Sequence, residues 1–171
     1  MAPDLKTTME RNIKALALRP AIGRGTATTK VRIRSGLTCD IDDGAWKLIA
    51  DEPPSNGGAG LGPDPGVLVR AGLGSCLAIG YAQWAAVLGL TLEDVEVTVE
   101  TDYDARGMYG IDAAMAPGWG AVRYRIAIAS SAPEAQVREL AELADRRSPI
   151  LDDLRRSVPI ARELHIGPAA G

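Results

Sequence analysis

The feature that most constrains this chain is a long uncharged segment near its middle. From Ala71 to Leu92 the sequence reads AGLGSCLAIGYAQWAAVLGLTL, without one formal charge. A run of this length meets the length criterion for a membrane-spanning helix. However, four glycines and three polar residues dilute its apolar character, and the alternating segments that flank it need an aqueous core to fold around. We therefore expect a helix over residues 65–88 that is buried at the centre of a domain or dimer, with no membrane partner.

Segments on both sides of this helix alternate apolar and polar residues with a period of two, which is typical of half-buried strands. Asp43-Gly44 is a strong hairpin signal between two of them. We expect strands within residues 26–34, 37–42, 46–50, 94–100, 122–128 and 158–166, a helix over 4–18, and a second core helix after Pro133 that Ser148-Pro149 interrupts. The resulting order, βββ-α-ββ-α-β, predicts an α+β domain without βαβ alternation.

Composition excludes several classes of function. The chain has 171 residues, of which 46% are hydrophobic and 24% charged, so it can bury a core as one domain. Its net charge of -3 and its scattered arginines provide no basic face, and we expect no nucleic-acid partner. Two cysteines do not make a disulfide scaffold, and the first residues lack the apolar stretch of a signal peptide. We expect a cytoplasmic protein.

The familiar cofactor motifs are missing from this sequence. GGAGLG lacks the Gly-Lys-Ser/Thr ending of a phosphate-binding loop, so we interpret residues 55–66 as a plain loop and expect no cofactor. His165 is the only histidine. A catalytic triad or a histidine-based metal site would need more partners than that.

Cys76 is the strongest candidate for a reactive residue in this sequence. Gly72, Cys76 and Gly80 are spaced by four residues and form one narrow stripe of small side chains along the predicted helix. Such a stripe either lets another backbone approach closely or leaves room for a ligand above the thiol. Both interpretations remain open from the pattern alone.

The segment GPDPGVLVRAGLGSCL around Cys76 resembles the OsmC/Ohr family of osmotically inducible and organic-hydroperoxide-resistance proteins. DEPPSNGGAGLGPDPG resembles the loop that leads into the family's central helix, DARGMYG a later loop, and ADRRSPI its Cys-Pro segment with a replacement. The resemblance spans about residues 26–166. It divides the chain into an N-terminal helix and linker, residues 1–25, and an OsmC-like domain, residues 26–171.

This resemblance implies an intertwined homodimer in which two long buried central helices are wrapped by antiparallel sheets. It also implies a cysteine-dependent peroxidase that acts on organic hydroperoxides or hydrogen peroxide. In that chemistry a thiolate becomes a sulfenic acid, and a second cysteine then closes a disulfide. Cys76 matches the attacking position.

The sequence departs from the family pattern at two positions. Ser148 stands before Pro149, where the second, resolving cysteine is expected, and serine cannot close a disulfide. Gly66 stands where the Ohr branch has a glutamate that orients an activating arginine. A buried thiol needs a nearby cation to react as a thiolate. Arg24 resembles the activating arginine, whereas helical geometry turns Arg70 away from Cys76.

Two hypotheses of different kinds follow for the function. In the first, Cys76 reduces hydroperoxides with an external thiol as reductant, since the second redox cysteine is missing. In the second, the dimer retains the fold and an apolar pocket but only binds a small ligand or senses oxidants. Cys39 could replace the resolving thiol, but its position between Leu37 and Ile41 favours a structural role.

Overall fold

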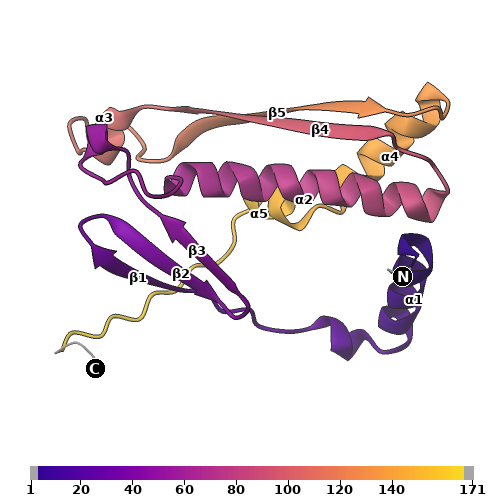
Figure 1. The fold of residues 1–171 in the computed structure, drawn as a ribbon, viewed down its shortest axis with the longest axis horizontal. Coiled ribbons are helices and arrows are strands. Elements are labelled where there is room, and N and C mark those ends of the chain that lie inside the picture. The colour runs from indigo at the N-terminus through magenta and orange to yellow at the C-terminus, as the bar shows by residue number, and fades with distance from the viewer. Residues whose placement is uncertain (1–3, 168–171) are drawn as a thin grey trace.

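The computed structural model describes residues 4–167 and has an α+β architecture, as predicted (Figure 1). A long central helix lies under a two-stranded sheet, and a separate three-stranded sheet lies on its other side. In chain order the elements are α1 (Leu5–Leu18), the 3-10 turn η1 (Pro20–Gly23), β1 (Lys30–Ser35), β2 (Thr38–Asp43), β3 (Trp46–Ala50), the 3-10 turn η2 (Pro54–Asn56), α2 (Pro65–Leu88), β4 (Asp94–Tyr103), α3 (Ala105–Met108), β5 (Trp119–Ala129), α4 (Glu134–Arg146) and α5 (Pro149–Arg155).

The central helix α2 confirms the prediction of a helix over the uncharged segment. The Asp64 side chain caps its first turn by accepting a hydrogen bond from the Val67 N–H at 2.8 Å. Pro65 follows at the first helical position, where a missing N–H has no cost. Gly89 ends the helix with a φ of 72°, in the left-handed region that glycine adopts without strain.

The hairpin of β4 and β5 covers one side of α2 along most of its length (Figure 1). Its inner face contributes alternating apolar residues, as the period of two predicts. They pack on the buried residues of α2, namely Leu73, Leu77 and Tyr81, and the strand residues in contact are Val95, Val97, Val99, Tyr124 and Ile126. This packing is the main core of the molecule.

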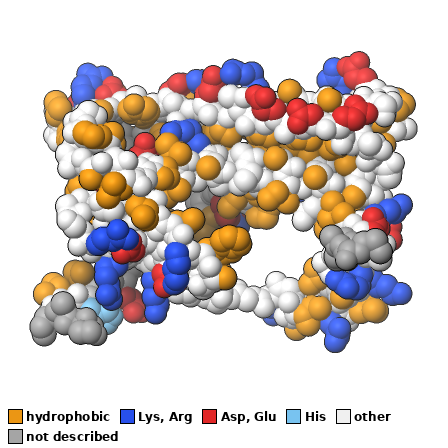
Figure 2. All heavy atoms as spheres, in the orientation of Figure 1, with side chains coloured by type: hydrophobic (Ala, Val, Ile, Leu, Met, Phe, Trp, Pro, Cys, Tyr) orange, Lys and Arg blue, Asp and Glu red, His pale blue; other side chains and the backbone are white. Residues whose placement is uncertain are grey.

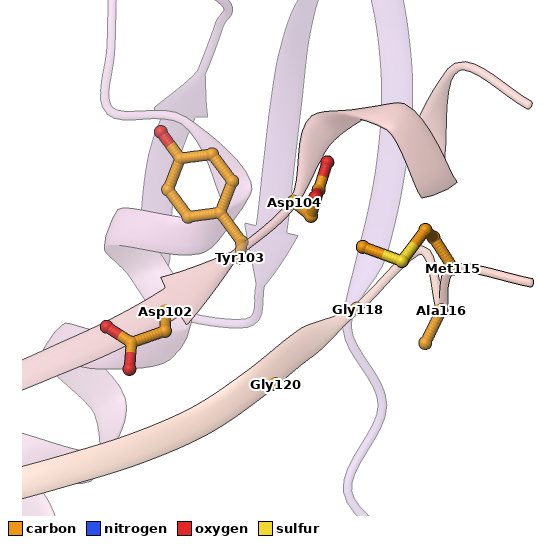
Figure 3. Close-up of a pocket in the computed structure, with 7 residues that line it drawn as sticks. All are labelled: Asp102, Tyr103, Asp104, Met115, Ala116, Gly118 and Gly120. Carbon is orange, nitrogen blue, oxygen red and sulfur yellow. The ribbon is translucent and has the colours of Figure 1, made fainter. Parts of the chain in front are cut away.

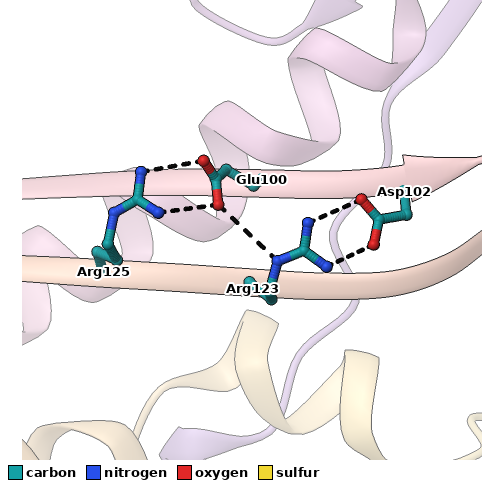
Figure 4. Close-up of polar contacts among 4 residues, drawn as sticks. All are labelled: Glu100, Asp102, Arg123 and Arg125. Atoms are coloured by element: carbon teal, nitrogen blue, oxygen red, sulfur yellow. Dashed lines mark hydrogen bonds and ion pairs between the residues drawn. The ribbon is translucent and has the colours of Figure 1, made fainter.

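The outer face of the same hairpin carries a ladder of ion pairs (Figure 4). Arg125 donates two hydrogen bonds to the Glu100 carboxylate, at 2.9 and 3.0 Å. Arg123 pairs with Asp102 and also lies 3.8 Å from Glu100. These side chains are exposed, so each pair contributes little by itself. Their alternation with the inner valines fixes which face of the hairpin points to solvent.

Two helices after β5 complete the core. The predicted interruption is confirmed: α4 ends at Arg146, and Ser148 caps α5, whose first residue is Pro149. Leu140 and Ala144 of α4 and Leu151 of α5 are buried, and both helices pack on α2. The break at Ser148-Pro149 therefore turns the chain back along α2 and leaves the Ser148 side chain buried against it.

The strands β1, β2 and β3 form an antiparallel sheet of their own, as predicted for the first three strands. Residues opposite one another in the register share a face. One face carries Val31, Ile41 and Leu48 side by side, and next to them Ile33 and Cys39. Val31 and Ile33 are 60% and 62% exposed, so residues 4–167 leave much of this apolar face uncovered.

The loop from β3 to α2 is held by a buried carboxylate. Asp51 accepts hydrogen bonds from the Thr38 hydroxyl at 3.0 Å and from the N–H groups of Ala59 and Leu61, each at 3.2 Å. Burial raises the pKa of Asp51, but the hydrogen bonds from Leu61, Thr38 and other donors outweigh it, and the pKa is lowered overall. The predicted Gly/Pro loop is thus irregular but firmly attached to β2.

The prediction of a final strand over 158–166 is wrong in this structure. Residues 156–167 contain no helix or strand, and Ile160 and Ile166 are more than 90% exposed. A strand needs a hydrogen-bonded neighbour, and this segment finds none among residues 4–167. His165 lies in the same exposed segment. The first strand is also shorter than predicted, because it begins at Lys30.

The apolar length of α2 is only partly covered within one chain. Four of its residues are buried, whereas Val67, Val69, Ile79 and Leu88 are exposed. Within residues 4–167, α2 is the one helix long and apolar enough to cross a membrane. Its packing on β4, β5, α4 and α5 identifies it as the core helix of the fold. The predicted burial of the whole helix is not reached in one chain.

Candidate functional site

The candidate site is a contact between the thiol of α2 and the hydroxyl that begins α5. Cys76 Sγ lies 3.3 Å from Ser148 Oγ, within hydrogen-bonding distance for sulfur. Cys76 is half-buried at the start of the fourth turn of α2, and Ser148 is buried, 4% exposed. The structure therefore brings together the two residues at the positions that the resemblance pairs as redox cysteines.

The Ser148 side chain has a second contact that orients it. Its Oγ accepts a hydrogen bond from the Leu151 N–H at 3.4 Å, which caps the first turn of α5. Because that oxygen is already an acceptor, its own proton is free to point at the sulfur of Cys76. The serine can thus stabilise negative charge on the sulfur, but it cannot form a covalent bond with it.

The small-residue stripe along α2 is open on the side that Cys76 shares. A Cβ placed on Gly72 or on Gly80 would meet nothing within 4 Å. The thiol is therefore flanked along the helix by two positions with free space above the backbone. This free space is compatible with both interpretations of the stripe. Another backbone could approach closely there, or a ligand could enter.

Arg24 lies outside this site within a single chain. It follows η1 on an exposed linker, residues 24–29, that contains no regular element. Figure 2 shows open space between this linker and α2. No hydrogen bond or ion pair joins Arg24 to Cys76 in the described part of the chain. Its predicted role as the activating cation is therefore not tested by the geometry of one protomer.

Gly66, where the resemblance leads us to expect a glutamate, lies beside Arg70. A Cβ on Gly66 would lie 3.3 Å from Nη1 of Arg70 and 4.0 Å from the ring of Trp119. The same Nη1 donates a hydrogen bond to the Thr101 hydroxyl at 3.4 Å. Arg70 thus turns toward β4 and away from the thiol, as helical geometry predicts. A side chain at position 66 would therefore meet Arg70, and glycine leaves the space beside this guanidinium open.

Cys39 makes no contact with Cys76 within residues 4–167, and both are free thiols. It lies on β2 between Ile33 and Ala50, and its Sγ is 3.8 Å from the Leu37 carbonyl oxygen. The same described residues contain no group of three His, Cys, Asp or Glu side chains that could hold a metal ion. Within one chain the site therefore rests on Cys76.

A partly buried polar network lies a little over one turn beyond the thiol. Asp145 of α4 accepts hydrogen bonds from the hydroxyls of Tyr81 at 2.5 Å and Tyr124 at 2.6 Å. Burial and then the bond to Asp145 raise the pKa of both tyrosines, so both remain neutral donors. Arg155 of α5 donates to the Tyr124 oxygen at 3.5 Å. The network joins α2, β5, α4 and α5 around the site.

A cavity of about 490 Å³ lies beside the site, between α2, β5 and α5. Its wall is mainly apolar, with the Tyr124 side chain and one charged residue, Arg155; the wall consists of Leu73, Trp119, Gly120, Ala121, Val122, Tyr124, Leu151, Leu154 and Arg155. Leu73 and Leu151 lie one helical turn from Cys76 and Ser148 respectively. The cavity is therefore adjacent to the thiol along both helices.

A smaller cavity of about 200 Å³ lies at the far end of the hairpin, where the loop after α3 folds back (Figure 3). Its acidic wall residues are Asp102 and Asp104. Both carboxylates are already paired, with Arg123 and Arg106 respectively. We assign no ligand to this cavity.

Comparison with known protein families matches the central part of this fold. The family model described as "OsmC-like protein" matches residues 57–163, which include α2, the β4–β5 hairpin, α4 and α5. The chain belongs to the OsmC-like family. The family predicted from the sequence around Cys76 is thereby confirmed, and Gly66, Cys76 and Ser148 all lie within the matched region. No curated protein sequence matches the chain significantly.

Solved structures show the same fold. An OsmC-like protein from Mycoplasma pneumoniae aligns with a TM-score of 0.66 at 14% identity, over 78% of this chain and 89% of that one. An organic hydroperoxide resistance protein from Legionella pneumophila aligns with a TM-score of 0.58 at 23% identity, over 77% and 90%. One from Elizabethkingia anophelis gives 0.58 at 18%, over 78% and 91%.

Several residues around the site were not identified from the sequence. The Tyr81–Asp145–Tyr124 network joins positions far apart in the chain, and no local pattern pairs them. Arg155 had a signal that sequence analysis did not use. It follows Ser148 by seven residues, close to two helical turns, which places both on the same side of α5.

Proposed function

We propose that this OsmC-like protein is a one-cysteine thiol peroxidase that reduces hydroperoxides at Cys76 and is regenerated by an external thiol. The observation that carries the proposal is the 3.3 Å contact between Cys76 Sγ and Ser148 Oγ. Hydroperoxide resistance belongs to the names of related structures, among them those from Legionella pneumophila and Elizabethkingia anophelis. This chain retains the fold and the first thiol of that chemistry.

The reaction begins at the sulfur of Cys76. Its thiolate attacks the terminal oxygen of the hydroperoxide, so that an S–O bond forms and the O–O bond breaks. The alkoxide leaves and takes up a proton to become an alcohol, and the cysteine becomes a sulfenic acid. The Ser148 hydroxyl is placed to donate a hydrogen bond to the charged sulfur.

Regeneration requires a reductant from outside, because Ser148 supplies no second thiol. The thiolate of a low-molecular-weight or protein dithiol attacks the sulfenic sulfur, which forms a mixed disulfide and releases water. The second thiol of the reductant then attacks that disulfide and frees Cys76. In total, one hydroperoxide becomes an alcohol and water, and one dithiol becomes a disulfide. The thiols needed for this step favour a cytoplasmic location.

The proposed working form is an intertwined homodimer. Two apolar surfaces are uncovered within one chain, one on the β1–β2–β3 sheet and one on α2. A second copy would cover both, and it would give residues 158–166, which keep the alternation of a strand, an edge to pair with. The same arrangement allows Arg24 on the exposed linker to reach the thiol of the other protomer, and we propose it as the activating cation.

Peroxide consumption tests the proposed function. With a small dithiol as reductant, wild-type protein should consume an organic hydroperoxide, and Cys76→Ser should reduce the rate to that of the dithiol alone. Cys39→Ser is the matched control and should retain the wild-type rate, because its sulfur lies on β2 beside the Leu37 carbonyl and not at the site. Equal rates for wild type and Cys76→Ser would exclude the peroxidase.

A further inference from the structure

The Asp145 side chain occupies an unusual place for a carboxylate. It belongs to the second-last residue of α4, where the partial negative charge of the helix end disfavours a further negative charge. Both of its oxygens are nevertheless used. One accepts a hydrogen bond from the Tyr81 hydroxyl at 2.5 Å, and the other accepts one from the Tyr124 hydroxyl at 2.6 Å. Asp145 thus ties the end of α4 to the central helix α2 and to strand β5.

The short turn that follows Asp145 leads directly to the candidate site. The Ser148 N–H donates a hydrogen bond to the Asp145 carbonyl oxygen at 3.3 Å. Ser148 then begins α5, and its Oγ lies 3.3 Å from Cys76 Sγ. The position of this hydroxyl against the sulfur therefore depends on where the end of α4 is held.

Side-chain contacts join this turn to α2 at three places along the helix. The pairs are Cys76 with Ser148, Tyr81 with Asp145, and Trp84 with Arg147, whose guanidinium carbon lies 5.8 Å from the centre of the Trp84 ring. Arg147 is exposed, and the contact of an exposed cation with an aromatic ring is weak. The short hydrogen bonds to the Asp145 carboxylate are stronger, because their acceptor is charged. Asp145 is therefore the main polar attachment of the turn.

The two tyrosines also offset the negative charge that Asp145 brings near the thiol. Tyr81 follows Cys76 by five residues, which is roughly 7–8 Å along the axis of α2. A carboxylate without hydrogen-bond donors near the sulfur would disfavour a thiolate. Burial and then the bond to Asp145 raise the pKa of both tyrosines, so both hydroxyls keep the protons that they donate. The carboxylate can thus hold the turn with little repulsion of the thiolate.

We propose that Asp145 is a positioning residue for the reaction at Cys76, because it fixes the turn that holds the Ser148 hydroxyl against the sulfur. Within residues 4–167 the Asp145 side chain bonds only to the two tyrosines, so its effect on the sulfur passes through Ser148. When the turn is no longer held, the hydrogen bond from Ser148 to the thiolate weakens. This inference rests on the proposed function, but its test does not need peroxide turnover.

The test measures the rate at which iodoacetamide alkylates Cys76 as a function of pH, in a Cys39→Ser background that leaves one thiol. The midpoint of this profile reports how well the site stabilises the thiolate. Asp145→Ala should raise the midpoint by up to about one pH unit, because the hydrogen bond from Ser148 to the charged sulfur is weakened. A carboxylate that acted only through its charge would give the opposite sign, since its removal would lower the midpoint.

Two further comparisons separate positioning from a general loss of stability. In a Ser148→Ala background, Asp145→Ala should cause no further rise, because the residue through which it acts is gone. Glu142→Ala removes an exposed carboxylate three residues earlier on α4 and should leave the midpoint unchanged. If Asp145→Ala does not fold, Tyr124→Phe removes one of the two donors to the carboxylate. It should raise the midpoint, and the rise should be clearly smaller in the Ser148→Ala background.

The inference is overturned if the midpoint of the folded variant stays at or below that of the wild type, if the rise is the same in the Ser148→Ala background, or if Glu142→Ala raises the midpoint equally. Each of these results leaves the proposed function intact, since that function depends on peroxide consumption at Cys76. Conversely, a wild type that consumes no peroxide would overturn the proposed function alone, because a raised midpoint would still assign Asp145 its effect on the thiol.

Discussion

At Ser148 a hydroxyl occupies the place from which a second thiol would attack. The distance of 3.3 Å from Oγ to Cys76 Sγ is short enough that a sulfur at this position needs only a small shift to reach bonding distance. We therefore expect Ser148→Cys to form an intramolecular disulfide with Cys76 when peroxide is added. The measurement is the loss of both free thiols in a Cys39→Ser background, with no disulfide-linked dimer on a non-reducing gel.

Ser148→Ala is the control for this experiment. It should retain a sulfenic acid that a dimedone probe labels, because nothing in the chain closes a disulfide. Its peroxide reaction should be several-fold slower than that of the wild type, since a hydrogen bond to a charged group is lost. If Ser148→Cys retained both thiols after oxidation, the proposed geometry of the pair would be wrong.

At the scale of elements, three packed segments meet at the Asp145 carboxylate. Tyr81 lies on α2, Tyr124 on β5 and Asp145 on α4, and the three side chains form one partly buried hydrogen-bonded group. Removing the Tyr81 hydroxyl leaves this carboxylate with one donor fewer. We expect Tyr81→Phe to lower the free energy of unfolding at pH 7 by about 1–2 kcal/mol, measured by urea denaturation at one protein concentration.

The same substitution should also change how the free energy of unfolding depends on pH. Burial, followed by the bond to Asp145, raises the pKa of Tyr81 above its ordinary value of 10.0. A tyrosine pKa that is raised in the folded state stabilises the fold at pH values below the pKa of the unfolded state. This stabilisation is lost as the pH rises above about 10. Wild type should therefore lose more stability than Tyr81→Phe between pH 9 and 11. Tyr109→Phe, at an exposed position, should follow the wild type; equal slopes for all three would contradict the prediction.

At the scale of the whole molecule, local signals predicted the elements that are complete within one chain. The alternation in the hairpin strands, the cap at Asp64 and the break at Ser148-Pro149 each act within a few residues. The same alternation over 158–166 predicted a strand that one chain does not form, because the pattern specifies a face but not the neighbour that must pair with it. The cavity between α2, β5 and α5 was not predicted, because segments far apart in the chain form its wall.

The exposed apolar face of the β1–β2–β3 sheet predicts where two protomers contact each other. Val31, Ile33 and Leu48 share this face, and all are at least half exposed within one chain. Exposed apolar area of this kind marks an interaction surface, and the intertwined homodimer would bury it. We expect the wild type to sediment as a dimer and Ile33→Glu to weaken that dimer at least about 100-fold, since each protomer would bury an unpaired charge. Arg32→Gln changes the opposite face of the same strand and should remain dimeric. A monomeric wild type, or an Ile33→Glu dimer as stable as that of Arg32→Gln, would show that this face is not the interface.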